Sequence, residues 1–214
     1  FVNHLVPESY GFTVDEKFME MERRLSVLKP GETGLLALDW NNGNRTILVD
    51  VRLTGLILGQ TLHTEAHEIY RTLIEATAFG ALTIIKRMEE YGIPVDRVIN
   101  TGGLAVKNAT LMQIYADILG RPLQVAASDQ TCALGAAIFG AVCGGDAELK
   151  DVQSRCCRLR DVSYEPIPEN QAVYEKIYGL YREIHDAFGS ASWEGSLANV
   201  MKDLLSIREQ QRKG

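Results

Sequence analysis

Apolar residues recur at intervals of three and four along four stretches of the chain, which is the spacing of one helix face. In the first stretch, Phe18, Met21, Leu25 and Leu28 fall at this spacing before a Lys-Pro-Gly sequence ends the pattern. The longest stretch begins near residue 64 and stops before Gly92 and Pro94. We therefore predict helices over residues 17–28, 64–91, 170–188 and 197–205.

Shorter apolar runs predict strands at residues 35–39, 98–101 and 123–126. Residues 47–50 fit a short strand or an extended connector, and residues 55–59, with a glycine at each end, are predicted to begin a short apolar helix. The last two strands are each followed by a helical pattern, from Ala109 and over 131–142. Two successive strand-loop-helix units predict parallel strands. Three strands are fewer than the ~5 to 6 of an average sheet, so we expect upstream residues to complete it.

A pair of glycines, Gly102 and Gly103, separates the strand at 98–101 from the helix that begins at Ala109. Glycine allows close approach of the backbone to a ligand, and a helix start offers free N–H groups to a phosphate. The same residues also fit an ordinary turn, with Asn108 as the N-cap of the helix. The pattern thus indicates a nucleotide site without excluding a simple turn.

Composition and charge exclude some classes of protein. The chain has 214 residues, 46% of them hydrophobic, which suffices for a substantial core. A net charge of −6 disfavours a nucleic-acid binder, and no apolar run approaches the ~20 residues that span a bilayer. The four cysteines include no C-x-x-C pair, which fits reduced thiols in a cytoplasm. We expect Cys132 and Cys143 to be small core residues.

Three separated motifs resemble the C-terminal domain of the FGGY carbohydrate kinases. They are the segment from Thr101-Gly102-Gly103 to Pro122, the segment Ala133-Leu134-Gly135-Ala136-Ala137, and Gly55-x-x-x-Gly59 followed by 68–75, in which Gln60 and Thr72 depart from the family pattern. The resemblance covers nearly the whole chain. It implies the α/β fold of the actin-like (ribonuclease H-like) ATPases, with an incomplete, parallel-containing sheet flanked by helices and followed by C-terminal helices.

The resemblance also implies how the chain is divided. Residues 1–214 would be the nucleotide-binding C-terminal domain of a sugar kinase, truncated at its N-terminus. Residues 1–33 would form a connecting helical segment, residues 34–145 the α/β core and residues 160–214 the C-terminal helices.

Residue by residue, Gly102 and Gly103 match the glycines that lie against the nucleotide phosphates, and Asn108 matches a polar residue near the adenine. The loop is one residue longer than in glycerol kinases, so Lys107 is the alternative to Asn108. The implied cofactors are ATP and Mg²⁺, with the metal ligands outside this chain. Residues 38–45 and 111–115 resemble one member of the family most, and that resemblance implies L-ribulose, phosphorylated at its 5-hydroxyl, or a related ketopentose as the sugar substrate. No nucleic acid or membrane partner is expected. A homo-oligomer stays open.

No catalytic base can be matched to the family pattern on this chain. We interpret Asp39, Asp50 and Asp129, the acids near strand or helix ends, as caps or loop residues. His63 and His67 are four residues apart but lack further metal ligands. We therefore expect the chain alone to have no kinase activity. Two other classes stay open: a dinucleotide-binding oxidoreductase, although the glycine spacing is not G-x-G-x-x-G, and a non-enzymatic actin-like nucleotide-binding module.

Overall fold

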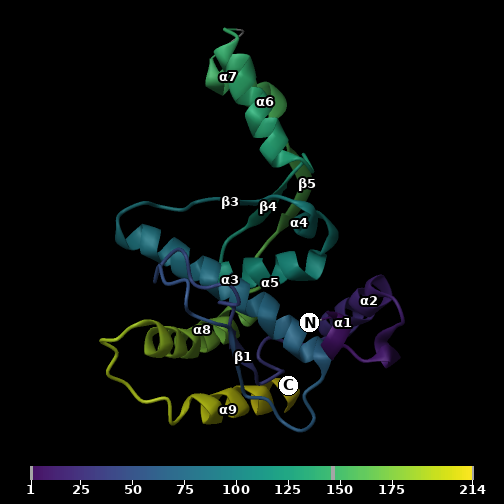
Figure 1. Ribbon diagram of the computed structural model, residues 1–214, viewed down its shortest axis with the longest axis vertical. Coiled ribbons are helices and arrows are strands. Elements are labelled where there is room, and N and C mark those ends of the chain that lie inside the picture. Colours follow the sequence, from purple (N-terminus) through teal and green to yellow (C-terminus); the bar gives the residue numbers. More distant parts are fainter. Residues whose placement is uncertain (1, 146–147, 214) are drawn as a thin grey trace.

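The computed structural model describes residues 2–145 and 148–213, and it shows an α/β body from which one pair of helices projects (Figure 1). Thr13 begins α2 with a reciprocal capping box, in which the Glu16 side chain accepts from the Thr13 backbone. The helices are α1 (Val2–Leu5), η1 (Glu8–Tyr10), α2 (Val14–Leu25), α3 (Ala66–Glu90), α4 (Gly103–Lys107), α5 (Ala109–Leu119), α6 (Thr131–Cys143), α7 (Leu149–Cys156), α8 (Pro168–Gly189) and α9 (Val200–Lys213).

The strands form two separate sheets in the described part of the chain. Strands β1 (Leu36–Leu38) and β2 (Leu56–Leu58) pair antiparallel, while the second sheet has the order β3 (Val98–Asn100), β4 (Leu123–Ala126), β5 (Leu159–Tyr164). Strands β3 and β4 are parallel, as the two strand-loop-helix units predict, and β5 joins antiparallel. The strands predicted at 35–39, 98–101 and 123–126 are therefore confirmed.

Within residues 55–59, Leu56–Leu58 form the strand β2, so the prediction of a short helix there is wrong. Each residue of β2 pairs with one of β1, and Gly59 follows at a φ of +87°. A Cβ atom on Gly59 would collide with the carbonyl oxygen of Gly34. Gly59 thus allows two backbone segments to pass close to each other. A run of three apolar residues between two glycines does not indicate such a contact.

The long helix α3 crosses the centre of the body and packs against β1, α2 and α5 (Figure 1). Its buried face includes Ile74, Ala78, Phe79 and Leu82, and these side chains share one core with the aromatic residues of α8. Phe79 lies 5.3 Å, between ring centroids, from Tyr181 of α8. The four predicted helices are all present, which reflects how strongly this core selects one face of each helix.

A buried polar network ties α3 to α8 within that core. The Arg71 guanidinium lies 2.8 Å from Glu75 and donates to the Tyr174 hydroxyl at 2.9 Å and to the Leu25 carbonyl at 3.0 Å. The Tyr174 hydroxyl in turn donates to Glu75 at 2.9 Å. Every charged group in the network therefore has a partner, as burial requires.

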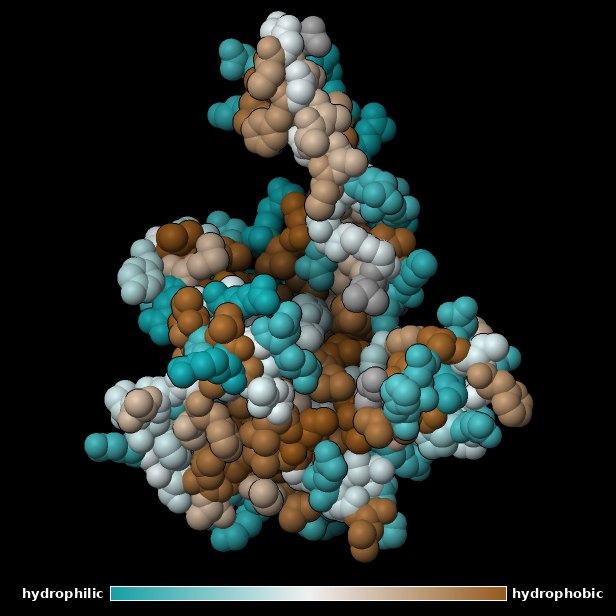
Figure 2. All heavy atoms as spheres, viewed as in Figure 1, coloured by the Kyte–Doolittle hydropathy of each residue, from teal (hydrophilic) through white to brown (hydrophobic). Residues whose placement is uncertain are grey.

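Helices α6 and α7, which we call the arm, project from the body (Figure 1). Ile138 is the one residue of α6 that is buried in the described structure, and Phe139 is 61% exposed. Apolar atoms accordingly reach the surface of the arm (Figure 2). Cys132 and Cys143 are exposed, so our expectation that they are core residues is wrong: the arm has no body of protein packed around it.

Among the described residues, no helix is both long and apolar enough to cross a membrane.

Candidate functional site

The glycine pair lies where β3 leaves the sheet. Strand β3 ends at Asn100, Gly102 adopts a φ of +91°, and Gly103 is the first residue of the short helix α4. A Cβ atom added at either glycine would meet no other atom within 4 Å. The backbone at both glycines is therefore open to approach by a ligand, and Gly102 also has a conformation that other residues rarely adopt.

Asn108 is the N-cap of α5, as the sequence predicts. Its Oδ1 accepts a hydrogen bond from the Leu111 backbone N–H at 2.7 Å, and its Nδ2 donates to the Glu22 carboxylate of α2. The side chain is 6% exposed. Burial raises the pKa of Glu22, although the hydrogen bonds from Asn108 and Tyr70 act in the opposite direction. Both polar atoms of the Asn108 amide are thus engaged within the protein.

Lys107, the alternative to Asn108, is the last residue of α4, and its side chain is exposed. Neither a hydrogen bond nor an ion pair engages its ammonium group within the described part of the chain. The five-residue helix α4 occupies the stretch that we expected to be a loop. Its presence separates Asn108 from the glycine pair by one helical turn.

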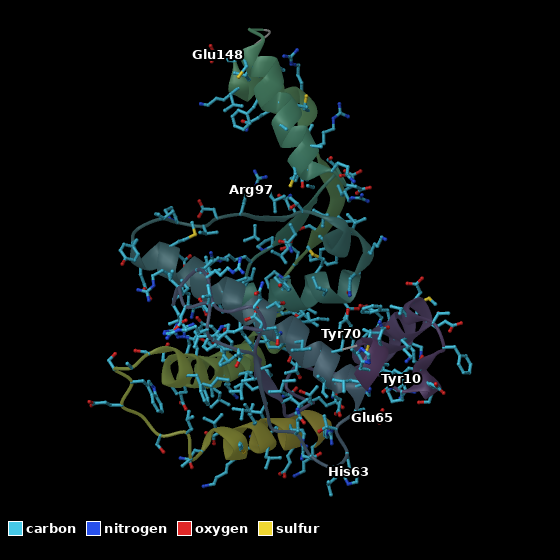
Figure 3. The ribbon with its side chains drawn as sticks, in the orientation of Figure 1. Tyr10, His63, Glu65, Tyr70, Arg97 and Glu148 are labelled. Carbon is cyan, nitrogen blue, oxygen red and sulfur yellow. The ribbon has the colours of Figure 1, made fainter. Side chains whose placement is uncertain are left out.

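A cavity of about 490 Å³ lies between the open face of the β3–β4 pair and the arm. Thr101, directly before Gly102, lines it, together with Ser128 and Thr131 at the end of β4 and the start of α6. Arg97, on the segment that leads into β3 (Figure 3), and Arg158 line it as well. Two guanidinium groups, three hydroxyl groups nearby and an apolar floor suit a ligand that carries both an apolar ring and an anion.

Sequence reasoning missed Arg97 and Arg158. Arg97 stands directly before the apolar run of β3, and Arg158 directly before β5, the strand that we did not predict. Their shared cavity depends on that strand pairing with β4. The sequence Leu-Arg-Asp-Val-Ser-Tyr at 159–164 has no regular alternation of polar and apolar residues that would indicate a strand.

The three acidic residues near strand and helix ends lie in different environments. Asp129 pairs with Arg160 at 2.8 Å, and Asp50 pairs with the neighbouring Arg52 at 3.1 Å. Asp39 lines a second cavity, which shares no residue with the first. His67 contacts the Tyr10 hydroxyl at 2.9 Å, and the described residues include no cluster of three or more metal-ligating side chains.

Comparison with known proteins shows similarity to one family. The sequence profile of the FGGY family of carbohydrate kinases, C-terminal domain, matches residues 12–143. The chain is 47% identical over 197 residues to a ribulokinase of Geobacillus thermodenitrificans, covering 90% of this chain and 34% of that protein. It is 43% identical over 222 residues to a ribulokinase of Halalkalibacterium halodurans, covering 100% of this chain and 38% of that protein. The chain thus spans about a third of the length of these relatives.

The fold matches solved structures of the same family. A ligand-bound xylulose kinase from Lactobacillus acidophilus superposes with a TM-score of 0.70 at 23% identity, over 84% of this chain and 35% of that one. The α/β, actin-like fold class implied by the motifs is therefore confirmed, although the sequence likeness to this structure is low.

Proposed function

Because the chain belongs to the FGGY family of carbohydrate kinases, we propose that it supplies the nucleotide-binding part of an ATP-dependent sugar kinase. The observation that carries the proposal is the open glycine pair at the end of β3 within the matched residues. Two arginine side chains line the adjoining cavity and would attract a nucleotide phosphate.

In this proposal the backbone of Gly102 and Gly103 lies against the phosphates, and Asn108 lies near the adenine. The glycines fit the group because no side chain blocks their approach. Asn108 can contact the adenine when its Nδ2 donates to the adenine instead of to the Glu22 carboxylate. Its Oδ1 then continues to cap α5. Bound ATP would supply the phosphoryl group, and Mg²⁺, whose ligands we expect outside residues 1–214, would neutralise the charge that develops on it.

We further propose that the whole protein phosphorylates L-ribulose at its 5-hydroxyl. The support is the identity of 43% and 47% to proteins named ribulokinase, over at least 90% of this chain. Residues 38–45 and 111–115 resemble the same enzyme. The division into residues 1–33, 34–145 and 160–214 belongs to this proposal as well, with the strand β5 at the start of the last segment.

The two other classes fit these observations less well. A dinucleotide-binding oxidoreductase would need the G-x-G-x-x-G turn, whereas the turn here contains two adjacent glycines and then α4. A non-enzymatic actin-like module would share the fold, but it would not account for the high identity to ribulokinases.

The test is nucleotide binding by the purified chain, measured by calorimetry with ATP and with NADH. We expect ATP to bind and NADH not to bind. Gly103→Val should lower the affinity for ATP by at least about tenfold, because its side chain would occupy the space that a phosphate needs. It should leave the fold intact, since a Cβ there meets nothing within 4 Å.

Gly140→Val is the matched control. Gly140 lies in α6 with equally open surroundings, and it does not line the cavity beside β3. Unchanged ATP affinity in Gly103→Val, or an equal loss in Gly140→Val, would show that the glycine pair is not the phosphate site.

A further inference from the structure

A third cavity lies where the start of α3 meets the C-terminal half of α9, away from the glycine pair (Figure 1). It has a volume of about 400 Å³. The segment that leads into α3 lines it with His63 and Glu65 (Figure 3), and α9 lines it with Arg208 and Arg212. This cavity shares no lining residue with the cavity beside β3, and none of its residues has a part in the nucleotide site proposed above.

The two carboxylates of this cavity already have donors within the protein. Glu65 accepts hydrogen bonds from the Tyr10 hydroxyl at 2.9 Å and from Arg24 at 3.1 Å. Glu68 accepts from the Glu65 backbone N–H at 2.8 Å and from Arg212 at 3.3 Å. Each carboxylate therefore has a guanidinium partner, which balances its negative charge.

Arg208 has no such partner. Within residues 2–145 and 148–213, no hydrogen bond or ion pair engages its guanidinium, although the residue is only partly exposed. Its stem lies against the bare backbone of Gly34, because a Cβ atom on that glycine would be 2.8 Å from Arg208 Cδ and 3.4 Å from its Nε. Ile207, the residue before it, is buried in the core and fixes this turn of α9. The fold thus holds one uncompensated guanidinium at the cavity.

The neutral groups that lack a partner at this cavity are donors as well. Thr33 is 4% exposed, and its Oγ1 accepts from the Leu35 backbone N–H at 3.1 Å. Its hydroxyl hydrogen has no acceptor in the part of the chain that the structure describes. The His63 side chain also forms no hydrogen bond with a described residue, and an imidazole N–H is a donor. A buried hydroxyl with an unused hydrogen can be satisfied by a ligand.

These groups select the charge of the ligand. Every group without a partner is a hydrogen-bond donor, so the ligand must supply acceptors. One uncompensated cation matches one negative charge, whereas a second negative charge would be repelled by Glu65 and Glu68. A carboxylate meets both conditions, because its two oxygens accept the parallel N–H groups of a guanidinium. The volume limits the ligand to a small molecule.

We propose that this cavity binds a small monocarboxylate, with Arg208 as its bidentate partner and with Thr33 and His63 as further donors. An acceptor oxygen next to the carboxylate allows the ligand to use all three groups. The site goes beyond the proposed function, because it lies in a different cavity from that of the nucleotide. Its failure and the failure of the nucleotide site are therefore observed separately.

The test is titration of the 214-residue chain with pyruvate at pH 7, followed by NMR chemical shifts of labelled backbone amides. Pyruvate carries one negative charge and a carbonyl oxygen beside the carboxylate. We expect saturable binding in the millimolar range, with shifts in residues 33–34, 61–68 and 207–212. Sulfate, a dianion of similar size, should bind at least about tenfold more weakly, because its second charge is repelled by the two carboxylates.

Arg208→Gln should weaken pyruvate binding about tenfold or more, because it removes both the charge and the paired N–H groups. Arg208→Lys retains the charge without the planar fork, so its affinity should lie between those of Arg208→Gln and the unmodified chain. Lys202→Gln is the matched control, because Lys202 is an exposed cation of the same helix that does not line the cavity. It should bind pyruvate as the unmodified chain does.

Thermal melts and ATP titration of the same variants separate this site from a structural role and from the nucleotide site. Pyruvate should raise the melting temperature of the unmodified chain and of Lys202→Gln, but not that of Arg208→Gln. ATP affinity should be the same in all of these variants. The proposal is overturned if pyruvate does not bind saturably, if Arg208→Gln binds it unchanged, if Lys202→Gln loses as much affinity as Arg208→Gln, or if sulfate binds as tightly as pyruvate.

Discussion

Asp39 shows how one residue can couple stability to pH. Burial raises the pKa of its carboxyl in the folded chain, whereas the unfolded chain has the ordinary value of about 3.9. Below the unfolded pKa, both states hold the proton and the residue costs nothing. As pH rises towards the folded pKa, the unfolded state releases its proton first, so stability falls.

Asp39→Asn should therefore stabilise the chain at pH 7 and have little effect at about pH 3. Urea unfolding of the unmodified chain and of Asp39→Asn at the two pH values measures this effect. The difference in the free energy of unfolding between the two proteins at each pH removes the contributions of other acids. An equal effect at both pH values would mean that the charge of Asp39 is not the cause. Burial raises the pKa values of Tyr181 and Tyr115, and the charge of Asp39 also raises them. Both tyrosines therefore stay neutral between pH 3 and pH 7.

The buried pair of Arg71 and Glu75 gives a second prediction at this scale. Arg71→Met should destabilise the chain by about 3 to 5 kcal/mol, because it leaves a buried carboxylate with only the Tyr174 hydroxyl as partner. Burial and the Glu75 charge hold the pKa of Tyr174 well above its ordinary value, so the tyrosine provides no charge in compensation.

Denaturant unfolding measures that loss, and the exposed pair of Arg182 and Asp186 provides the control. Arg182→Met removes an ion pair of the same helical spacing, whose side chains are 35% and 38% exposed, and should cost less than about 1 kcal/mol. The double variant Arg71→Met with Glu75→Leu should be less destabilised than Arg71→Met alone. If it is not, an unpaired charge is not the source of the loss.

Part of the candidate site could be predicted from single residues and their neighbours in sequence. The glycine pair and the Asn108 cap follow from local chemistry, which a sequence carries in neighbouring residues. The contact of Asn108 with Glu22 and the shared cavity of Arg97 and Arg158 join residues far apart in the chain. No local spacing encodes such contacts.

At the level of elements, the helices with an apolar period were predicted, α5 and α6 included, whereas the short helices α1, α4 and α7 and the strand β5 were not. Helices α3 and α8 each bury a continuous face, which imposes the helical period on their sequence. Strand β5 has no buried residue, so burial imposes no strand period on it. Helix α6 of the arm has the small-residue composition of a packed helix, and only its position in space shows that it is exposed.

Considered whole, the molecule has one cavity beside the β3–β4–β5 sheet and another at the end of β1 in the smaller sheet. We expect the purified chain to transfer no phosphoryl group from ATP to L-ribulose in the presence of Mg²⁺, because phosphoryl transfer also needs a group that orients the sugar hydroxyl. A coupled assay for ADP release measures this. The expectation is wrong if the purified chain catalyses this transfer and Gly103→Val abolishes the activity. The catalytic base would then lie within residues 1–214.

The projecting arm has a consequence for cooperativity. Since α6 and α7 each bury one residue, Ile138 and Val152, their hydrogen bonds can open while the body stays folded. Amide hydrogens of the arm should exchange with solvent through such local openings, and those of β1 and α3 only through global unfolding. Arg71→Met should then speed exchange in α3 and leave exchange in α6 unchanged, so that one polypeptide behaves as two thermodynamic units.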